Sequence, residues 1–435
     1  MRQWYQYHES SLPARTQGKL CMSAQNTDEL LRQFHHNQSV WVARLSTGLV
    51  DPPRSDRNML HVGDTLAMRP GAAGVIMLPM SDETSTILAD HDRALAWLRQ
   101  HRSRDVLVWS MQPNPEIDLA MLAQGYHPGF EPWWMTRDLT SPIETPRHHV
   151  RPVTALDIKQ LIESDVPYVV RDQVAANTSL IHAPGDPHVI WLVAVVDSKP
   201  VGHAIVNLTD DHAGLFNVGV SNEYRHRGIG TSLTLASLRA ARDQGARTMN
   251  LNSTPIGLKL YEHTGFRQFG VGQTWVRSGR QVQTTPDPQE QRLVHAIGTG
   301  DIAAIVVRSS TKRVLTCGLS LQELAARFGQ PAALQEIIRQ GRTPEIISLW
   351  KAGLRDEAIR AANDPVAREW LSGSNRAHPI HHAIEMGAGT LVIELIAAGA
   401  NLNARDAGYN ATPLDWAHAC NKPTIARIIR QAGGK

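Results

Sequence analysis

One stretch of the chain joins an apolar, strand-like run to a helical run through a turn rich in glycine. Residues 214–220 read as a strand and residues 231–244 as a helix. The turn at 225–230 has the pattern R-x-x-G-x-G. Successive backbone N–H groups of such a turn, with the dipole of the following helix, form an anion site. Because Gly228 and Gly230 lack a Cβ, a phosphate can approach the backbone.

A second motif follows this turn at a fixed distance. After the helix comes a short strand at 247–251, and then Leu260-Tyr261-Glu262-His263-Thr264-Gly265-Phe266. Tyr261 lies 31 residues after Gly230. In order and spacing, residues 151–277 resemble the GNAT family of N-acetyltransferases. In that family R-x-x-G-x-G/A cradles the pyrophosphate of acetyl-CoA, and L-Y-x-x-x-G-F follows the next strand. The G-x-x-x-x-G-K-[ST] and G-x-G-x-x-G patterns of other phosphate sites do not fit.

The resemblance implies a set of residues that contact acetyl-CoA, the expected cosubstrate. Backbone N–H groups of the turn would bind the pyrophosphate, and those of Val218 and Val220 the pantetheine and the thioester carbonyl. Asn252 or Ser253 would bond the pantetheine or the acceptor, or else cap the next helix. The expected cofactor-binding residues are Val218, Val220, Arg225, His226, Arg227, Gly228, Ile229, Gly230, Thr231 and Asn252.

Tyr261 stands where the family places a general acid. Transfer of the acetyl group expels a thiolate, and a free thiol has a pKa of about 8.5 against about 10 for a phenol. Proton donation from Tyr261 is therefore a reasonable catalytic role. The alternative is a helix tyrosine that only packs on the sheet.

The general base is harder to assign, because residues 214–220 contain no carboxylate, whereas the family often places a Glu there. The candidates are Asp210, Asp211 and His212 in the preceding turn and His203 on the preceding strand. A water relay, or an amine that is already partly neutral, would need no base.

The first third of the chain echoes the middle without the glycine-rich turn. A strand at 105–110 and a helical run at 115–122 lead to Gly125-Tyr126, which resembles Gly265-Phe266. Trp133-Trp134-Met135 resembles the last strand of a GNAT domain. We therefore interpret residues 1–145 as a degenerate GNAT-like domain, with an unrelated α/β domain as the alternative. Since R-x-x-G-x-G occurs once, CoA is expected to bind once.

The last third has the pattern of helical repeats. His378-Pro379-Ile380-His381-His382-Ala383 and Thr412-Pro413-Leu414-Asp415-Trp416-Ala417 resemble the ankyrin pattern T-P-L-H-x-A. Their prolines are 34 residues apart, close to the ankyrin period of about 33. Weaker copies begin near 293, 323 and 349. A polar stretch at 278–290 reads as a linker, so truncation after about Pro286 is expected to leave the rest folded.

The predicted fold class is thus two GNAT-like mixed α/β domains followed by an α-helical ankyrin-repeat domain. The expected ranges are 1–145 for the degenerate domain, 146–277 for the catalytic domain, 278–290 for the linker and 291–435 for the repeats. Within the catalytic domain, Thr154 and Asp157 are expected to form the capping box of a first helix.

Composition indicates which partners and which cellular compartment to expect. A formal net charge of +3 argues against a nucleic-acid-binding surface. Cys21, Cys317 and Cys420 are far apart and odd in number, which favours reduced thiols in the cytoplasm. No apolar run approaches the roughly 20 residues that span a bilayer, and the polar start predicts no signal peptide. The paired histidines have no ligand partner at a recognised spacing, so no metal site is expected.

The function predicted from the resemblance is transfer of acetyl from acetyl-CoA to a primary amine of a small molecule, bound between the two GNAT-like halves. An aminated natural product or antibiotic is one such acceptor, which implies self-protection or tailoring. The loop at 175–187 would help to shape the acceptor site. The alternatives are a protein acetyltransferase, or an acyl-CoA-sensing scaffold, with a protein partner recruited by the ankyrin repeats.

Overall fold

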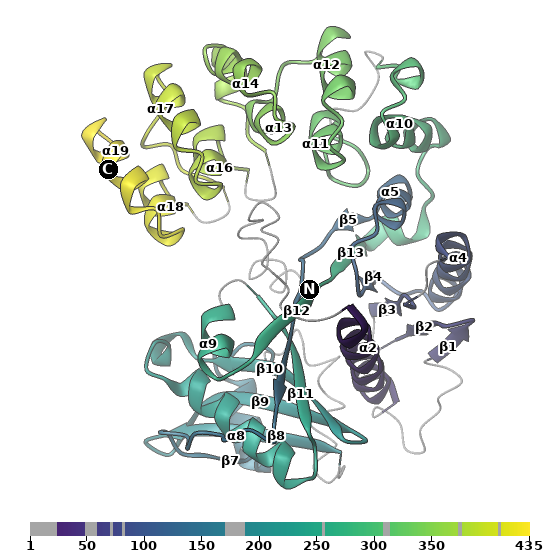
Figure 1. Ribbon diagram of the computed structural model, residues 1–435, viewed down its shortest axis with the longest axis vertical. Coiled ribbons are helices and arrows are strands. Elements are labelled where there is room, and N and C mark those ends of the chain that lie inside the picture. Colours follow the sequence, from purple (N-terminus) through teal and green to yellow (C-terminus); the bar gives the residue numbers. More distant parts are fainter. Residues whose placement is uncertain are drawn as a thin grey trace. The chain divides into compact units, whose positions relative to one another are not determined.

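The computed structural model describes residues 24–47, 59–69, 73–80, 83–169, 188–254, 257–307, 314–372, 376–407 and 410–435 (Figure 1). Cys21 and the loop expected at 175–187 lie outside these residues. The chain forms two compact units. Of the described residues, the first unit, called the sheet unit, contains those from 24 to 114 and from 129 to 284. The second, called the helical unit, contains those from 115 to 128 and from 285 to 435.

The first sheet of the sheet unit is built mostly from the N-terminal third. Its strands follow the order β1-β2-β3-β4-β13, and only β3 and β4 are parallel. Helix α4 packs on β1, β2 and β3. The elements are β1 (Met59–Val62), β2 (Thr65–Met68), β3 (Ala73–Met77), α4 (Thr84–Gln100), β4 (Asp105–Ser110) and β13 (Gln273–Ser278).

The second sheet has seven strands in the order β12-β6-β11-β10-β9-β8-β7, of which only β10 and β11 are parallel neighbours. Helix α8 lies across one face of this sheet (Figure 1). The elements are β6 (Trp133–Asp138), β7 (Val150–Pro152), α6 (Ala155–Ile162), β8 (Val189–Val196), β9 (Lys199–Thr209), β10 (His212–Val220), η2 (Asn222–Tyr224), α8 (Ile229–Asp243), β11 (Thr248–Ser253), α9 (Leu258–His263) and β12 (Arg267–Val271).

The two sheets exchange strands. Strand β6, expected to close the N-terminal half, lies between β11 and β12 of the second sheet, with Met135 opposite Leu251. Strand β13, most of which falls in the range 146–277 expected for the catalytic domain, pairs with β4 of the first sheet, with Trp275 opposite Val108. Both strands are buried on both faces, so their local pattern does not specify which sheet they join. The ranges 1–145 and 146–277 therefore do not divide the strands, although as a division of function they stay a prediction.

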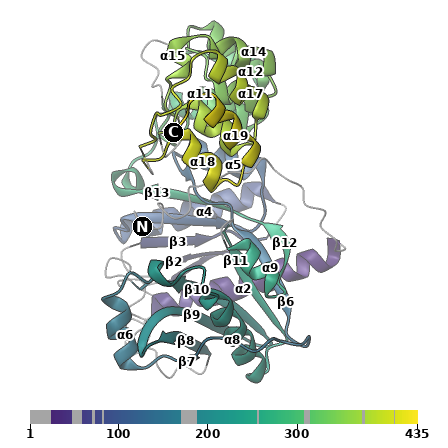
Figure 2. The same ribbon diagram turned by 90° about the vertical axis from the view of Figure 1, so that its left-hand side faces the viewer.

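A single apolar core joins the two sheets. Helix α2 (Ala24–Thr47) lies between them (Figure 2) and contributes Leu31, Phe34 and Trp41. The Trp41 ring stacks on Phe216 of β10 at a centroid distance of 4.8 Å. The Phe34 ring lies 4.5 Å from that of Trp134, which stands on the exchanged strand β6. Burial of these large side chains, roughly 1.5–3 kcal/mol each, stabilises both sheets together.

Helix pairs make up the helical unit. In several pairs the first helix ends at a glycine with positive φ, namely Gly329 (64°), Gly353 (84°) and Gly387 (68°). The positions of these pairs match the expected repeats, but their assignment to ankyrin repeats stays a prediction. The elements are α10 (Pro288–Thr299), η4 (Ile302–Ala304), α11 (Leu321–Arg327), α12 (Pro331–Arg339), α13 (Ile346–Lys351), α14 (Arg355–Ala362), α15 (Pro365–Arg368), α16 (Pro379–Glu385), α17 (Gly389–Ala397), α18 (Pro413–Ala419) and α19 (Pro423–Gln431).

A segment of the N-terminal third also belongs to the helical unit. Helix α5 (Pro115–Ala123), followed by the short strand β5 (His127–Pro128), packs against α10. Leu119 fills the space beside Gly298, where a Cβ would collide with it. Asp118 forms an ion pair with Arg327 at 3.7 Å. Truncation after Pro286 would remove these partners and expose α5. The contacts weigh against the expected separability of the repeats, which stays a prediction.

The polar stretch at 278–290, whose role as a linker stays a prediction, contains local structure. It contains the 3-10 turn η3 (Gly279–Gln283), and Val282 within it is fully buried. The Arg99 side chain donates a hydrogen bond to the Val282 carbonyl at 2.6 Å. In the part of the chain that the structure describes, no helix is long and apolar enough to cross a membrane.

Candidate active site

The parallel strands β10 and β11 pair over three positions only. His212 to Gly214 lie opposite Thr248 to Asn250, and the pairing stops there. On its other side β10 has a bulge, where its register with β9 shifts between Phe216 and Gly219, and Asn217 has a φ of 53°. The Ser221 N–H donates to Val201 of β9 at 2.9 Å. Since N–H directions alternate along a strand, the Val220 N–H points toward β11, where a ligand can accept it.

The glycine-rich turn leads directly into α8, as the sequence predicts. The first hydrogen bond within the helix runs from the Ser232 N–H to the Gly228 carbonyl at 3.0 Å. The N–H groups of Ile229, Gly230 and Thr231 therefore have no acceptor inside the helix. Ile229 is 2% exposed and packs in the core on the α8 face of the sheet. The turn thus presents free N–H groups on an anchored helix end, which suits a phosphate.

The two glycines of the motif are required for different reasons. Gly228 has a φ of 82°, and the nearest atom to an added Cβ would be His148 Nε2 at 3.7 Å, so space is available but the conformation favours glycine. At Gly230 an added Cβ would lie 2.8 Å from Leu260 Cδ1 of α9. Gly228 shapes the turn, and Gly230 lets α9 approach α8.

The basic side chains of the turn have unequal surroundings. Arg225 is half-buried, and its Nε donates to the Val220 carbonyl at 3.3 Å, which ties the turn to the end of β10. Arg227 is exposed and lies over the Tyr224 ring at 5.2 Å. His226 is exposed with a φ of 60°. Arg227 and His226 are therefore accessible to a bound anion, whereas Arg225 also has a structural role.

Tyr261 lies on α9, directly beside α8. Its half-buried ring meets the Phe266 ring edge-on at 5.8 Å. Burial, and then the phenol of Tyr168, raise the pKa of Tyr261 above its usual value of about 10. The phenol is therefore neutral at pH 7, as it would be at its usual pKa, and it can donate a proton only where a basic leaving group forms beside it.

The turn between β11 and α9 differs from the expectation that Asn252 or Ser253 caps the next helix. Asn252 lies half-buried on β11, and Ser253 donates to the Thr254 carbonyl at 2.8 Å. The turn before α9 is closed by Thr254, whose Oγ1 accepts from the Gly257 N–H at 3.3 Å. Neither Asn252 nor Ser253 caps the helix, so Asn252 remains available to a ligand.

The four general-base candidates do not converge on this site. Asp210, Asp211 and His212 lie at the start of β10, five residues or more before the bulge at Asn217, which is roughly 16 Å along a strand. His212 contacts Thr248 Oγ1 at 2.7 Å and Asp211 at 3.1 Å.

His203 is close to the bulge, but both of its ring nitrogens are engaged. The Trp191 Nε1–H donates to its Nδ1 at 3.1 Å, so its Nε2–H donates to the Pro167 carbonyl at 2.8 Å. Burial lowers the pKa of His203 to about 4, so the ring is neutral at pH 7. His203 therefore fixes the backbone before Tyr168. Of the alternatives for deprotonating the amine, a water relay or an amine that is already neutral is left.

Sequence reasoning missed three residues near the site. Tyr168 has a φ of 69°, a conformation that a bulky residue rarely adopts and that functional sites often contain. His148 contacts the Arg227 carbonyl at 2.8 Å. Arg137 reaches α9 from the exchanged strand β6. No local motif marks them, because each contact joins segments far apart in the chain.

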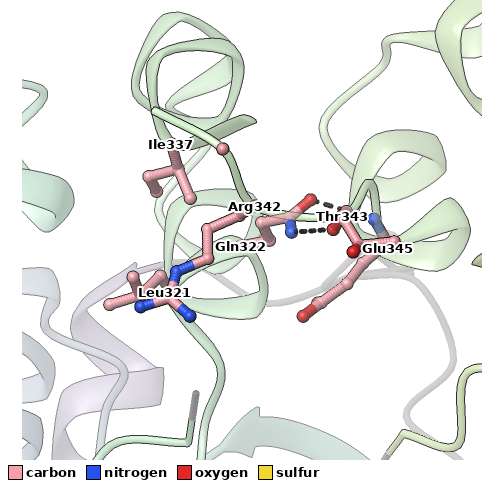
Figure 3. A pocket seen from close by; sticks show the side chains of 7 residues that line it. Leu321, Gln322, Ile337, Arg342, Thr343 and Glu345 are labelled. Carbon is pink, nitrogen blue, oxygen red and sulfur yellow. Dashed lines mark hydrogen bonds between the residues drawn. The ribbon is translucent and has the colours of Figure 1, made fainter. Parts of the chain in front are cut away.

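The helical unit holds a cavity of about 130 Å³ that contains none of the predicted site residues (Figure 3). The Gln322 amide spans one wall, where it donates to the Thr343 carbonyl at 2.7 Å and accepts from the Glu345 N–H at 2.9 Å. Glu345 in turn accepts from the Ser320 and Ser348 hydroxyls. These bonds join consecutive helix pairs. Among the described residues, no group of three His, Cys, Asp or Glu side chains could hold a metal.

Comparison with known proteins agrees with this geometry. Residues 156–266 match the model of the acetyltransferase (GNAT) family. Similar solved structures include GCN5-related N-acetyltransferases from Kribbella flavida (15% identity, TM-score 0.41, covering 55% of this chain and 96% of that one) and Sphaerobacter thermophilus (16%, 0.38, 56% and 91%). Another is a tandem GNAT protein from the clavulanic acid biosynthesis pathway (15%, 0.37, 59% and 97%). No curated protein matches the chain.

The matched range contains the bulged strand, the glycine-rich turn, α8 and Tyr261. GNAT proteins generally use acetyl-CoA. The chain therefore carries a GNAT acetyltransferase domain at residues 156–266, and the protein is an acyltransferase enzyme of this type.

Proposed function

We propose that the protein transfers acetyl from acetyl-CoA to a primary amine of a small molecule. The observation that carries this proposal is a single continuous arrangement. The bulged strand β10 parts from β11 after Gly214, runs into the N-terminus of α8, and has α9 with Tyr261 beside it.

The residues present fit acetyl-CoA. The N–H groups of Ile229, Gly230 and Thr231 suit a pyrophosphate, because they have no acceptor within the helix. The exposed Arg227 and His226 add positive charge there. Val218, Val220 and Asn252 line the parted strands and would hold the pantetheine arm. When bound, acetyl-CoA supplies an activated acetyl thioester.

The catalytic contribution of the chain would then be proton transfer and orientation. Tyr261 Oη holds a proton at neutral pH and would donate it to the departing thiolate. The Val220 N–H is a donor for an acyl oxygen. Since the four base candidates are remote or engaged, the amine would lose its proton to water or arrive neutral.

The architecture of the sheet unit is the ground for proposing a small-molecule acceptor. Helix α2 and the exchanged strand β6 bring the N-terminal third against the second sheet. We propose that residues 1–145 supply a degenerate GNAT-like half and that the acceptor binds between the two halves. An aminated natural product or antibiotic fits this class, with self-protection or tailoring as the outcome. Residues 291–435 would be an ankyrin array, and the protein would act in the cytoplasm.

The test is thiol release from acetyl-CoA with a panel of amines, namely amino acid derivatives, amino sugars and lysine peptides. The proposal expects turnover with at least one small amine, and loss of that turnover in Gly228→Val. Turnover with lysine peptides alone would replace it by protein acetylation guided by the repeats. Acetyl-CoA binding without turnover of any amine would favour an acyl-CoA-sensing scaffold.

A further inference from the structure

Arg137 is a buried cation on the exchanged strand β6. It is 9% exposed, although its neighbour Asp138 is exposed. Its register partner on β11 is Met249, a core residue of the α8 face, so Arg137 belongs to that face as well. One guanidinium nitrogen, Nη1, donates to the Thr264 carbonyl, and Nη2 donates to the Pro142 carbonyl at 2.8 Å.

The bond to Thr264 restrains the end of the helix that carries Tyr261, and the bond to Pro142 anchors the guanidinium to the segment after β6. Thr264 is the C-terminal cap of α9, and its carbonyl is one of the groups that a helix leaves without an internal partner. A cation at this position also interacts favourably with the negative end of the helix dipole. Since guanidinium stays protonated at any ordinary pH, this interaction does not depend on pH.

The glycine of the second motif is explained by the same side chain. Gly265 has a φ of 84°, and an added Cβ would lie 3.0 Å from Arg137 Nη1. The guanidinium therefore occupies the space that a side chain at position 265 would need. The L-Y-x-x-x-G-F turn and Arg137 fit each other, although they are contributed by different thirds of the chain.

Helix α9 depends on such contacts because it is short. It has six residues, and no side chain caps its N-terminus. Isolated helices of this length are not stable in water, so tertiary contacts must fix its position. The Arg137 bond to Thr264 acts at the C-terminal end, and the approach of Leu260 to Gly230 acts on the side toward α8.

We infer that Arg137 is a positioning residue, contributed by the N-terminal third, which holds α9 so that Tyr261 Oη faces the reacting thioester. This inference rests on the proposed function, because Tyr261 serves there as the proton donor. It gives the N-terminal third a part in catalysis beyond completing the fold.

The test is a double-mutant cycle on kcat with Arg137→Met, Tyr261→Phe and both together. Arg137→Met is expected to lower kcat about 10-fold or more, since misplacement of about 1 Å can cost up to about 10²-fold. The dissociation constant of acetyl-CoA should change less than about 2-fold. In the Tyr261→Phe background the same substitution should have almost no further effect. If the two losses multiply, or if Tyr261→Phe leaves kcat unchanged, Arg137 does not act through Tyr261.

A measurement without turnover separates this inference from the proposed function. Amide hydrogen exchange in residues 258–264 should accelerate in Arg137→Met and recover partly in Arg137→Lys, which keeps one donor and the charge. The matched control is Arg267→Met, which removes an exposed arginine from β12, the neighbour of β6. Unchanged exchange in a folded Arg137→Met, or equal acceleration in the control, overturns the inference. Absence of turnover in the wild type, with exchange as expected, refutes only the proposed function.

Discussion

The two sheets differ most at their one parallel pair of strands. In the first sheet, Ala73–Met77 of β3 pairs with Asp105–Trp109 of β4 at every position, and the Leu78 N–H continues to the Trp109 carbonyl at 3.0 Å. In the second sheet, pairing of β10 with β11 ends at Gly214, and a bulge follows. The two parallel strands thus stay paired along their length in the first sheet and separate after Gly214 in the second. We expect the ligand site where the pairing of β10 with β11 ends.

The helices that follow these strands show a similar contrast. Helices α5 and α9 end in the same way, with Gly125 and Gly265 at φ of 80° and 84°. The N–H of Tyr126 bonds to Met121, and that of Phe266 bonds to Tyr261. Met121 therefore stands where the other helix has its phenol. Helix α9 packs on α8 beside the glycine-rich turn, and α5 packs on α10 in the helical unit.

Splitting the chain at residue 146 tests whether either sheet can fold without the other. Of all the predictions, we expect the largest effect on folding from this change. A fragment beginning at residue 146 lacks β6, so β11 and β12 lose their common neighbour. We expect it to be unfolded or aggregated, since unpaired edges of buried strands associate. Circular dichroism and size-exclusion chromatography measure the outcome.

Co-expression with residues 1–145 is the control for the split. The two fragments should assemble and recover acetyl-CoA binding, because together they contain all of the exchanged strands. A fragment from residue 146 that folds and binds alone would show that β6 can be replaced.

Truncation after Pro286 sharpens the comparison of α5 with α9. Loss of α10 should expose Leu119 and leave Asp118 without Arg327. We expect lower solubility and a fall in thermal stability of several degrees, because exposing one large apolar side chain costs roughly 1.5–3 kcal/mol. Leu119→Gln in the truncated chain should restore part of the solubility. A truncated chain that melts as the full protein does would reinstate separable repeats.

Calorimetry with CoA tests the contrast between open and closed strand pairs. We expect one site per chain, since only β10 and β11 part. Gly228→Val should weaken binding about 10²-fold or more, because it strains the turn and blocks the N–H groups. Gly245→Val is the matched control, since Gly245 also has a positive φ, 92°, in open space at the other end of α8. Two equal sites, or equal losses in both variants, would remove the distinction between the sheets.

The contrast between Tyr261 and Met121 predicts a catalytic effect. Tyr261→Phe should lower kcat by about 10²-fold, the lower range for general acid catalysis, with little change in acetyl-CoA affinity. Steady-state kinetics and calorimetry separate the two quantities. A kcat that is unchanged between about pH 6 and 9 would leave Tyr261 as a packing residue like Met121.

A pH titration probes the second sheet alone, through His203. Its pKa is about 4 in the folded protein against about 6.5 unfolded. The unfolded chain therefore binds more protons between these values, and stability is lost as pH falls from about 6.5 toward 4. At pH 5 the loss is about 2 kcal/mol. His203→Gln, which can make both hydrogen bonds, should reduce the drop in unfolding free energy between pH 7 and 5 by that amount. An equal drop in both proteins would contradict the assignment.

Local signals in the sequence predicted local structure well. The capping box of Thr154 and Asp157 is present as expected, and so is the glycine-rich turn at the start of α8. The matching helix ends at Gly125 and Gly265 confirm the similarity noted between them. Each depends on residues within a few positions of one another, where propensity and hydrogen bonding act directly.

Contacts between distant segments could not be predicted in this way. The patterns of β6 and β13 suit either sheet, so their exchange is decided by the whole core. Arg137 and His203 carry no motif, and their roles depend on partners in other segments. The assignment of α5 to the helical unit depends on Leu119 and Gly298, which are far apart in sequence.

The exchange of strands also determines when each sheet can form during translation. Residues 133–138 leave the ribosome more than a hundred residues before β11, their first neighbour in the second sheet. At about 5–20 residues per second, this segment waits roughly 5–20 s. The first sheet waits longer still, because β13 is made after every other strand. The second sheet has all of its strands only after translation has passed Val271, and the first only after Ser278. The nascent chain should therefore rely on chaperones during that interval, and slower codons upstream would prolong its exposure.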